Sequence, residues 1–246
     1  MEAIKALSLG KLTLGGKSVA LVAPNGSGKT SNCIAPAILY FLTCFPRGQV
    51  PVTSSSWMQV EKQLFPALRR YMDNPFFAGW TFNKTEIRTP EGGFAVGFST
   101  DNAGRAEGWH PKISPDVDPV FYVLDEAKTI PDSIFTAVSR CTLFHAFITS
   151  SPGADSGTFY DCFHKNSSLY YKIRVKYEDC PHIEINDPGK AERLKKEYGE
   201  QSSFYRSAIL GEFTDLDGQS VISRRSLMEL VNNPPPFLDT GETCGG

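Results

Sequence analysis

The stretch Ser18-Val-Ala-Leu-Val-Ala-Pro-Asn-Gly-Ser-Gly-Lys-Thr30 joins a short apolar run to a glycine-rich turn that ends in Lys-Thr. Residues 19–22 predict a buried parallel strand, residues 24–28 a turn, and Lys29 the opening of a helix. The unpaired N–H groups at a helix start suit phosphate binding, and glycines let the backbone approach a phosphate closely. The pattern is that of a P-loop, G-x-x-x-x-G-K-[ST], with Ala23 in place of its first glycine.

A P-loop binds a nucleoside triphosphate with Mg²⁺, so the motif predicts ATP and Mg²⁺ as ligands. Lys29 is expected to span the β- and γ-phosphates, and the Thr30 hydroxyl to ligate Mg²⁺. The alternative is a glycine-rich hairpin that happens to contain a lysine. The expected phosphate-binding residues are Asn25, Gly26, Ser27, Gly28, Lys29, Thr30 and Ser31.

A second apolar run, residues 120–124, ends in Asp125-Glu126. Ligands bind at the carboxyl ends of strands in parallel α/β sheets, so both carboxylates are placed where chemistry is expected. Asp125 is predicted to hold Mg²⁺ together with Thr30, and Glu126 to orient and polarise the water that attacks the γ-phosphate. The alternative is that the two acids only cap the next helix.

Apolar runs and helical patterns alternate along the chain, which predicts an α/β fold with a mostly parallel sheet and flanking helices. Pro36 is expected to kink or shorten the first helix, and residues 104–118 to form a polar loop. Residues 82–87 and 93–99 are expected to form a shorter β-pair. The other expected strands are 18–22, 49–53, 120–124 and 143–149, and the expected helices are 30–44, 58–71 and 131–140.

The composition is that of a globular protein, with 246 residues, 41% hydrophobic and 21% charged. The formal net charge of −2 does not favour nucleic-acid binding over the whole surface, so any DNA contact has to be local. Each basic cluster can equally be a solvated face. The candidate clusters are Lys62 with Arg69 and Arg70, the segment 165–176, and Arg193 with Lys195 and Lys196.

Six cysteines show no C-x-x-C pair and no metal-ligand spacing, which is typical of free thiols in a reduced, intracellular protein. The longest apolar stretch, residues 34–45, is too short to span a bilayer, so no membrane association is expected.

Several segments resemble, in their order, the large terminase subunit of tailed bacteriophages. The resemblance covers about residues 18–225. The P-loop and the segment 125–128 equally resemble superfamily 2 helicases, whereas the Arg105 segment and the Gly-Glu-Phe tail favour terminase. The segments are Val52-Thr-Ser-Ser-Ser-Trp-Met-Gln59, Arg105-Ala-Glu-Gly108, Leu124-Asp-Glu-Ala127, Thr149-Ser-Ser-Pro152 and Leu210-Gly-Glu-Phe213.

The resemblance implies a P-loop NTPase of the RecA/ASCE-like type that hydrolyses ATP to drive viral double-stranded DNA into a preformed capsid. It implies a homo-oligomeric ring on the capsid portal, a small terminase subunit as partner, and a place in the host cytoplasm outside the mature virion. Two alternatives stay open. The chain can be the first RecA-like lobe of a superfamily 2 helicase or translocase, or a nucleotide-binding switch that does not hydrolyse ATP.

By position, the resemblance makes Lys29 and Thr30 the phosphate and Mg²⁺ ligands, Asp125 the Walker B carboxylate and Glu126 the catalytic base. Thr149, Ser150 and Ser151 match the coupling motif, since hydroxyls at the end of a neighbouring strand can sense the γ-phosphate through the attacking water or the catalytic base. The alternative for these three residues is a hydroxyl-stabilised turn before Pro152.

Arg105 is the predicted arginine finger, which would act on a neighbouring copy in a ring, with Arg140 as second choice. The alternative is a surface ion pair of Arg105 with Asp101 or Glu107.

Two features depart from the terminase pattern. No adenine-binding segment is evident before Ser18, and no set of spaced acidic residues follows Gly211, so nuclease activity is not expected of this chain. The predicted organisation is a P-loop ATPase domain with a C-terminal subdomain over residues 1–225, and a linker over 226–246 toward a missing nuclease domain.

Overall fold

The computed structural model describes residues 17–99, 103–113, 117–142, 145–214 and 230–233. An eight-stranded sheet forms the centre of the fold, in the order β10-β1-β9-β8-β2-β5-β4-β3. The strands from β10 to β5 run parallel, and β4 and β3 continue the sheet antiparallel at one edge. The sheet strands are β1 Ser18–Val22, β2 Gln49–Thr53, β3 Thr81–Asn83, β4 Glu86–Arg88, β5 Phe94–Gly97, β8 Phe121–Leu124, β9 His145–Ser150 and β10 Tyr170–Arg174.

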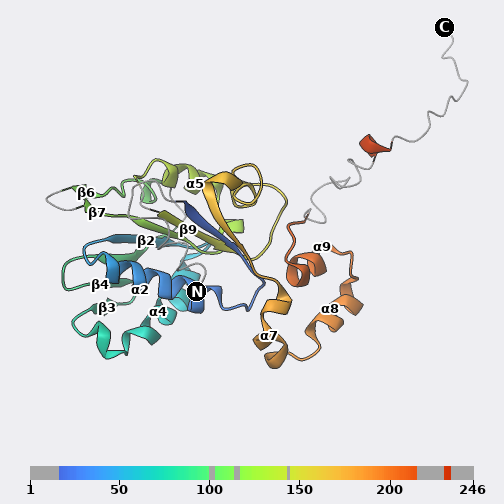
Figure 1. Cartoon of the computed structure of the whole chain (residues 1–246), viewed down its shortest axis with the longest axis horizontal. Coiled ribbons are helices and arrows are strands. Elements are labelled where there is room, and N and C mark those ends of the chain that lie inside the picture. The colour runs from blue at the N-terminus through green and yellow to red at the C-terminus, as the bar shows by residue number, and fades with distance from the viewer. Residues whose placement is uncertain (1–16, 100–102, 114–116, 143–144, 215–229, 234–246) are drawn as a thin grey trace, which may run out of the picture.

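Helices cover both faces of this sheet, so the expected α/β architecture is confirmed. In Figure 1, α5 lies above the sheet, and α2 and α4 lie below it. The longer helices are α2 Ala35–Cys44, α4 Phe65–Met72, α5 Asp132–Ser139, α7 Pro181–Asn186 and α8 Lys190–Tyr198. Shorter helices and turns are η1 Lys29–Ile34, α3 Trp57–Gln59, η2 Val60–Leu64, η4 Ala103–Arg105, η5 Ala127–Thr129, α6 Thr158–Asp161, η7 Tyr177–Asp179, α9 Ser203–Tyr205 and η8 Arg206–Leu210.

The core is split by the sheet into two apolar clusters. Along β1, Val19 and Leu21 pack into the cluster on the α2 side, whereas Ala20 and Val22 pack into the cluster on the α5 side. Strands buried on both faces need continuous apolar sequence, which explains the unbroken run before the P-loop.

The helix after the P-loop is continuous, and Pro36 does not end it. Residues Lys29–Ile34 form a widened turn, in which the Ala35 N–H donates to the Thr30 carbonyl, and α2 follows directly. Pro36 is within the first turn of α2, where a missing N–H is tolerated. The expected kink is therefore replaced by a change in hydrogen-bonding pattern just before the proline.

Two expectations for the edge of the sheet are corrected. Residues 82–87 do not form one strand, because β3 and β4 are separate antiparallel strands joined at Lys84 and Thr85. Part of the expected loop 104–118 is a small antiparallel pair, β6 Lys112–Ile113 with β7 Val117–Asp118. Residues 143–144 of the expected strand lie outside the described residues, and β9 starts at His145.

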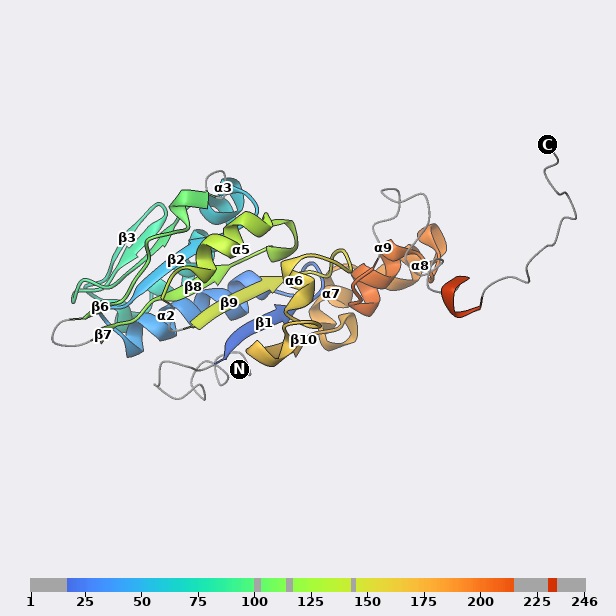
Figure 2. The same ribbon diagram turned by 90° about the horizontal axis from the view of Figure 1, so that it is seen from above.

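The helices α7, α8 and α9 lie beyond the carboxyl ends of the strands (Figure 2). The end of β1 is joined to this region because Val175, just after β10, donates its N–H to the Val22 carbonyl. The predicted boundary near residue 225 and most of the predicted linker lie outside the described residues, so that division stays a prediction. In the part of the chain that is described, no helix has the length and apolarity needed to cross a bilayer.

Candidate active site

The P-loop leaves β1, the second strand of the sheet, which lies between the edge strand β10 and β9. The Ala23 N–H donates to the Ser150 carbonyl (3.1 Å), which fixes the loop to the end of β9. Gly26 and Gly28 both have a φ of 81°, which side chains disfavour. A Cβ on Gly28 would lie 2.6 Å from the Asn32 side-chain nitrogen. The two glycines are therefore required by the turn.

Lys29 is folded into this turn and is only 6% exposed. Its ammonium donates to the carbonyls of Ala23 (3.4 Å) and Pro24 (3.3 Å). It also lies 3.9 Å from the Glu126 carboxylate. The charge thus sits between the P-loop backbone and the acidic pair, in a concave part of the loop that offers donors to an anion.

Asp125 meets the P-loop directly, because Thr30 Oγ1 donates to its Oδ2 at 3.0 Å. The same carboxylate accepts the Glu126 N–H (2.9 Å) and the Thr149 hydroxyl (3.4 Å). Burial raises the pKa of Asp125 to about 6, and the negative charge of Glu126 is the second cause of this rise. The hydrogen bonds of Asp125 and the positive charge of Lys29 lower the pKa by a smaller amount. A buried carboxylate beside a hydroxyl is a donor set that a divalent cation would stabilise.

Glu126 has φ 51° and ψ 42°, a left-handed conformation that no other described non-glycine residue adopts. Its side chain makes no capping hydrogen bond to the turn that follows, so helix capping does not account for its orientation. The carboxylate instead faces Lys29 and accepts the Ser150 hydroxyl (3.4 Å). Backbone strain of this kind is typical of functional positions.

The expected coupling residues end β9, which lies between β1 and β8. Thr149 bonds Asp125, and Ser150 bonds Glu126. Ser151 accepts a hydrogen bond from the Lys128 ammonium at 2.7 Å. All three hydroxyl residues are buried, and their bonds run to the neighbouring acidic segment. The structure thus brings these residues together with the P-loop and the acidic pair.

The remaining P-loop side chains make fewer contacts with the rest of the site. Asn25 is exposed at the tip of the loop, and Ser31 donates to the Gly28 carbonyl (3.4 Å). The Ser27 hydroxyl is buried and lacks a hydrogen-bond partner in the described part of the chain. A buried hydroxyl without a partner is unusual, and this one is available to a ligand atom.

Arg105 does not join this cluster within its own chain. The following residue, Ala106, accepts a hydrogen bond from Tyr122 on the face covered by α5. The segment then runs to His110, whose carbonyl accepts from Gln49 at the start of β2. It therefore leads away from the carboxyl ends of the strands, where the P-loop lies.

Of the two acids expected as surface partners of Arg105, Asp101 lies outside the described residues. The Glu107 carboxylate pairs with Arg140 at 2.6 Å, on an exposed part of the surface. Arg140, the second choice for the finger, is thus held by an ion pair at the far end of α5.

Three contacts of the site were missed by sequence reasoning. His182 of α7 lies with Nε2 3.0 Å from the Gly26 carbonyl. Ser207 of η8 donates to the Pro152 carbonyl (3.1 Å), so the C-terminal helices contact both the P-loop and the loop after β9. The third contact is that of Lys128 with Ser151. In the sequence, only the position of Lys128 close to Asp125-Glu126 could have indicated it.

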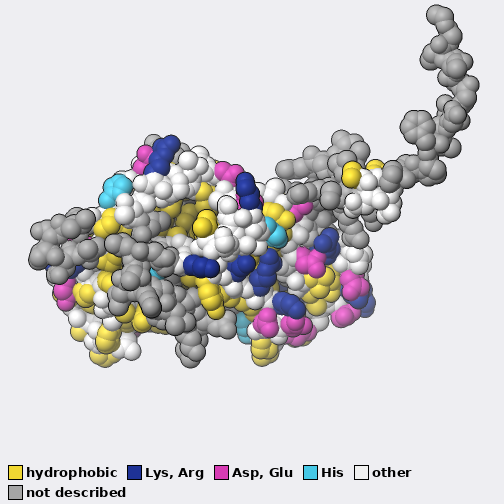
Figure 3. Space-filling model, turned by 45° about the horizontal axis from the view of Figure 1, so that its top comes forward, with side chains coloured by type: hydrophobic (Ala, Val, Ile, Leu, Met, Phe, Trp, Pro, Cys, Tyr) yellow, Lys and Arg dark blue, Asp and Glu magenta, His cyan; other side chains and the backbone are white. Residues whose placement is uncertain are grey.

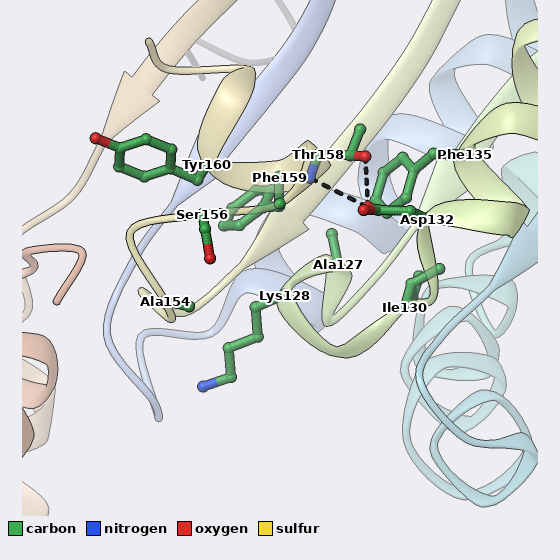
Figure 4. Close-up of a pocket in the computed structure, with 11 residues that line it drawn as sticks. Ala127, Lys128, Ile130, Asp132, Phe135, Ala154, Ser156, Thr158, Phe159 and Tyr160 are labelled. Carbon is green, nitrogen blue, oxygen red and sulfur yellow. Dashed lines mark hydrogen bonds between the residues drawn. The ribbon is translucent and has the colours of Figure 1, made fainter. Parts of the chain in front are cut away.

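A cavity of about 40 Å³ lies beside Lys128, at the start of α5 and α6. Asp132 on its wall accepts hydrogen bonds from the Thr158 N–H (3.2 Å) and hydroxyl (2.5 Å), as Figure 4 shows. None of the residues that line this cavity belongs to the P-loop, so the cavity is distinct from the predicted phosphate site. The Lys128 side chain points away from Asp132 and Thr158 in the same view.

Comparison with known proteins finds the same fold in phage large terminases. No protein-family model and no curated protein matches the chain. The large terminase of a thermophilic bacteriophage in complex with ADP matches with a TM-score of 0.62 and 13% identity, over 86% of this chain and 52% of that one. The complex of the same terminase with ATP-gamma-S matches with a TM-score of 0.61 and 14% identity, over 86% and 52% of the two chains.

The large terminase ATPase domain of Thermus phage P74-26 matches with a TM-score of 0.60 and 16% identity, over 87% of this chain and 96% of that one. The chain thus spans about half the length of the thermophilic bacteriophage terminase and nearly all of the isolated Thermus phage domain. The resemblance expected from the sequence motifs is confirmed at the level of the fold: this chain has the fold of the ATPase domain of phage large terminases.

Proposed function

We propose that this chain is the ATPase motor of a large terminase, which hydrolyses ATP to move viral double-stranded DNA into a capsid. The observation that carries the proposal is the 3.0 Å hydrogen bond between Thr30 and Asp125, residues 95 positions apart. It joins the P-loop to the acidic pair at the carboxyl edge of the sheet, where nucleotides bind in such folds. The ADP and ATP-gamma-S complexes of the thermophilic bacteriophage terminase support a nucleotide as ligand.

The residues present fit Mg·ATP. Thr30 and Asp125 would hold Mg²⁺, and the P-loop N–H groups, Ser27 and Lys29 would hold the phosphates. The magnesium ion would neutralise charge on the phosphate oxygens. Glu126 is 22% exposed, which leaves its carboxylate accessible to water, and Ser150 fixes its direction. Glu126 accepts a proton from the attacking water, and Lys29 stabilises the phosphate oxygens.

Thr149, Ser150 and Ser151 would report the state of the site to the rest of the motor. The loop that follows them is tied to the C-terminal helices through Ser207 and Pro152, and through the Thr214 N–H and the Gly153 carbonyl (3.1 Å). A change in the hydrogen bonds of Ser150 or Ser151 can therefore reach those helices through this loop.

DNA is the proposed cargo, and its contact has to be local at a net charge of −2. Figure 3 shows Lys and Arg side chains gathered near the middle of the face in view. Beside and on β10, Lys165 and Lys172 are exposed, whereas Arg174 stacks over the Phe163 ring at 4.8 Å. In the other two basic clusters, Lys62 pairs with Glu61, and Arg193 pairs with Asp187. We assign the DNA contact to Lys165 and Lys172.

Reversal of both charges, Lys165→Glu with Lys172→Glu, tests the DNA contact. It should weaken binding of a DNA duplex and reduce the salt dependence of log K by about two, since about one counterion is released per phosphate contact. Lys165 and Lys172 can instead serve only to protect the exposed edge strand β10 by their charge, and glutamate keeps a charge at both positions. Loss of DNA binding in the variant therefore distinguishes a DNA contact from this protective role. Unchanged binding would reject this surface. The control is Lys195→Glu with Lys196→Glu.

The nucleotide site is tested by the magnesium dependence of ATP binding. Thr30→Val removes the hydroxyl at nearly constant volume and should abolish the strengthening of ATP binding by Mg²⁺. Thr43→Val is the matched control, because the Thr43 hydroxyl only bonds the Leu39 carbonyl within α2. Equal magnesium dependence in Thr30→Val and the wild-type chain would contradict the proposed site.

A further inference from the structure

Lys128 is an exposed residue that lies two residues after Glu126. Its ammonium donates to the Ser151 hydroxyl (2.7 Å) and to the Pro152 carbonyl (3.4 Å). Both acceptors are neutral, and the described residues provide no carboxylate within ion-pair distance. Because both acceptors are neutral, the charge of the ammonium stays available to an anion that binds beside Ser151, and a hydrogen bond to an anion is stronger than one to a neutral group.

The lysine stem is held in place by its surroundings. A Cβ on Gly153 would lie 3.0 Å from Cβ and 3.1 Å from Cδ of Lys128, so a glycine there leaves room for the side chain. The Lys128 N–H donates to the Ser150 hydroxyl (3.3 Å), which itself bonds Glu126. Lys128 is therefore positioned by the same residues that orient the proposed catalytic base.

The ammonium shares its electrostatic environment with the P-loop. Burial lowers the pKa of Lys128, the Glu126 carboxylate opposes this shift, and the charge of Lys29 adds to it. Figure 4 shows the side chain extended away from the Asp132 wall, on the side of the P-loop ribbon, which is drawn in faint blue. Lys29 and Lys128 thus both interact electrostatically with the Glu126 carboxylate.

We propose that Lys128 is a second lysine of the triphosphate site, which contacts the terminal phosphate and makes the chain bind ATP more tightly than ADP. The assignment rests on the proposed function. In the absence of a terminal phosphate, the ammonium is held by Ser151 and Pro152, as the structure has it. With ATP bound, the phosphate supplies the anion that the described surroundings of Lys128 lack.

Equilibrium titration of the full chain with fluorescent analogues of ATP-gamma-S and of ADP tests this assignment. Lys128→Met keeps the apolar stem and removes the charge. It should weaken ATP-gamma-S binding about 10-fold or more, the usual effect of a lost charge-assisted hydrogen bond, and ADP binding less than about 2-fold. Lys128→Arg keeps the charge and should retain most of the preference for the triphosphate.

Lys84→Met is the matched control, since Lys84 pairs with Glu61 (2.8 Å) at the far edge of the sheet and should leave both affinities unchanged. An unaltered ratio of the two affinities in Lys128→Met would overturn the assignment and leave the proposed function intact. A wild-type chain that binds neither analogue would overturn the proposed function and this assignment with it.

Discussion

The site has a P-loop half, residues 23–31, and an acidic half, residues 125–128 with 149–153. The two halves differ in whether the backbone adopts an unfavourable conformation and whether a charge is destabilised by burial. In the P-loop half, left-handed angles fall on Gly26 and Gly28, which adopt them readily. In the acidic half, Glu126 carries a φ of 51°, and burial raises the pKa of Asp125 to about 6. The comparison indicates that one half binds at little cost to the fold, whereas the other stores strain at the residues proposed to do chemistry.

The largest expected effect comes from a residue in neither half. If Arg105 acts on a neighbouring copy, Arg105→Ala should lower ATP turnover by about 10³-fold or more, as loss of an arginine finger does. Mixing Arg105→Ala chains, which keep an intact P-loop, with Lys29→Ala chains, which keep Arg105, should restore turnover. The ATPase rate measured as a function of the mixing ratio checks this.

Arg140→Ala is the control for the finger, because Arg140 forms an exposed ion pair with Glu107, and such pairs contribute little. Absence of rescue at every ratio would reject Arg105 as a finger acting between copies. The rest of the site would be unaffected by that outcome.

The second prediction is that Asp125→Asn stabilises the chain. Because the folded-state pKa of about 6 lies above the usual 3.8, the folded state holds this proton more tightly than the unfolded state. The contribution of Asp125 to stability is therefore full below pH 3.8 and is lost as the pH rises through about 6. At pH 7.5, the neutral amide should raise the free energy of unfolding by about 3 kcal/mol.

Urea unfolding with EDTA present, at about pH 5 and pH 7.5, measures this effect. The gain of Asp125→Asn over the wild-type chain should be clearly larger at the higher pH, where the wild-type carboxylate is charged. A gain that does not depend on pH, or a loss of stability at pH 7.5, would show that Asp125 is not strained by burial.

The third prediction isolates the backbone strain at Glu126. Glu126→Gly and Glu126→Ala both remove the carboxylate, and they differ in that glycine accepts the left-handed conformation. Glu126→Gly should therefore be more stable than Glu126→Ala by about 1–2 kcal/mol, and both should be inactive. Ordinarily glycine is the less stable of the two, so the sign of the difference in urea unfolding decides the question.

Glycine should also be more stable than alanine in the P-loop half, with the smallest effect. Gly26→Ala and Gly28→Ala should each lower the free energy of unfolding by about 1 kcal/mol, because alanine is disfavoured at φ 81°. A Cβ at Gly26 would meet no other atom within 4 Å, so the stability change of Gly26→Ala measures only the cost of the left-handed backbone conformation. Stabilisation by either change would remove the contrast between the two halves.

The local motifs made most of the fold and the site predictable. The apolar runs before Gly28 and Asp125 are long enough to identify buried strands, and the carboxyl edge of a parallel sheet then brings Lys29, Asp125 and Ser150 together. What could not be predicted depends on tertiary contacts. His182 meets Gly26 because α7 folds back over the P-loop, and no sequence pattern near either residue encodes that approach.

The errors have local causes. The strand expected over 82–87 is broken at Lys84 and Thr85, since a two-residue hairpin there carries none of the usual glycine or asparagine signals at its centre. Lys128 was passed over because a single lysine in a turn is usually solvated, and its contacts with Ser151 and Pro152 depend on the space left by Gly153.

ATP binding and ATP turnover, measured separately in Glu126→Gln and Lys29→Ala, test the central claim most directly. If the two halves have the proposed roles, Glu126→Gln binds Mg·ATP with about wild-type affinity but loses turnover by about 10²-fold or more, because it cannot accept a proton from water. Lys29→Ala should lose binding itself. Wild-type turnover by Glu126→Gln would contradict the account.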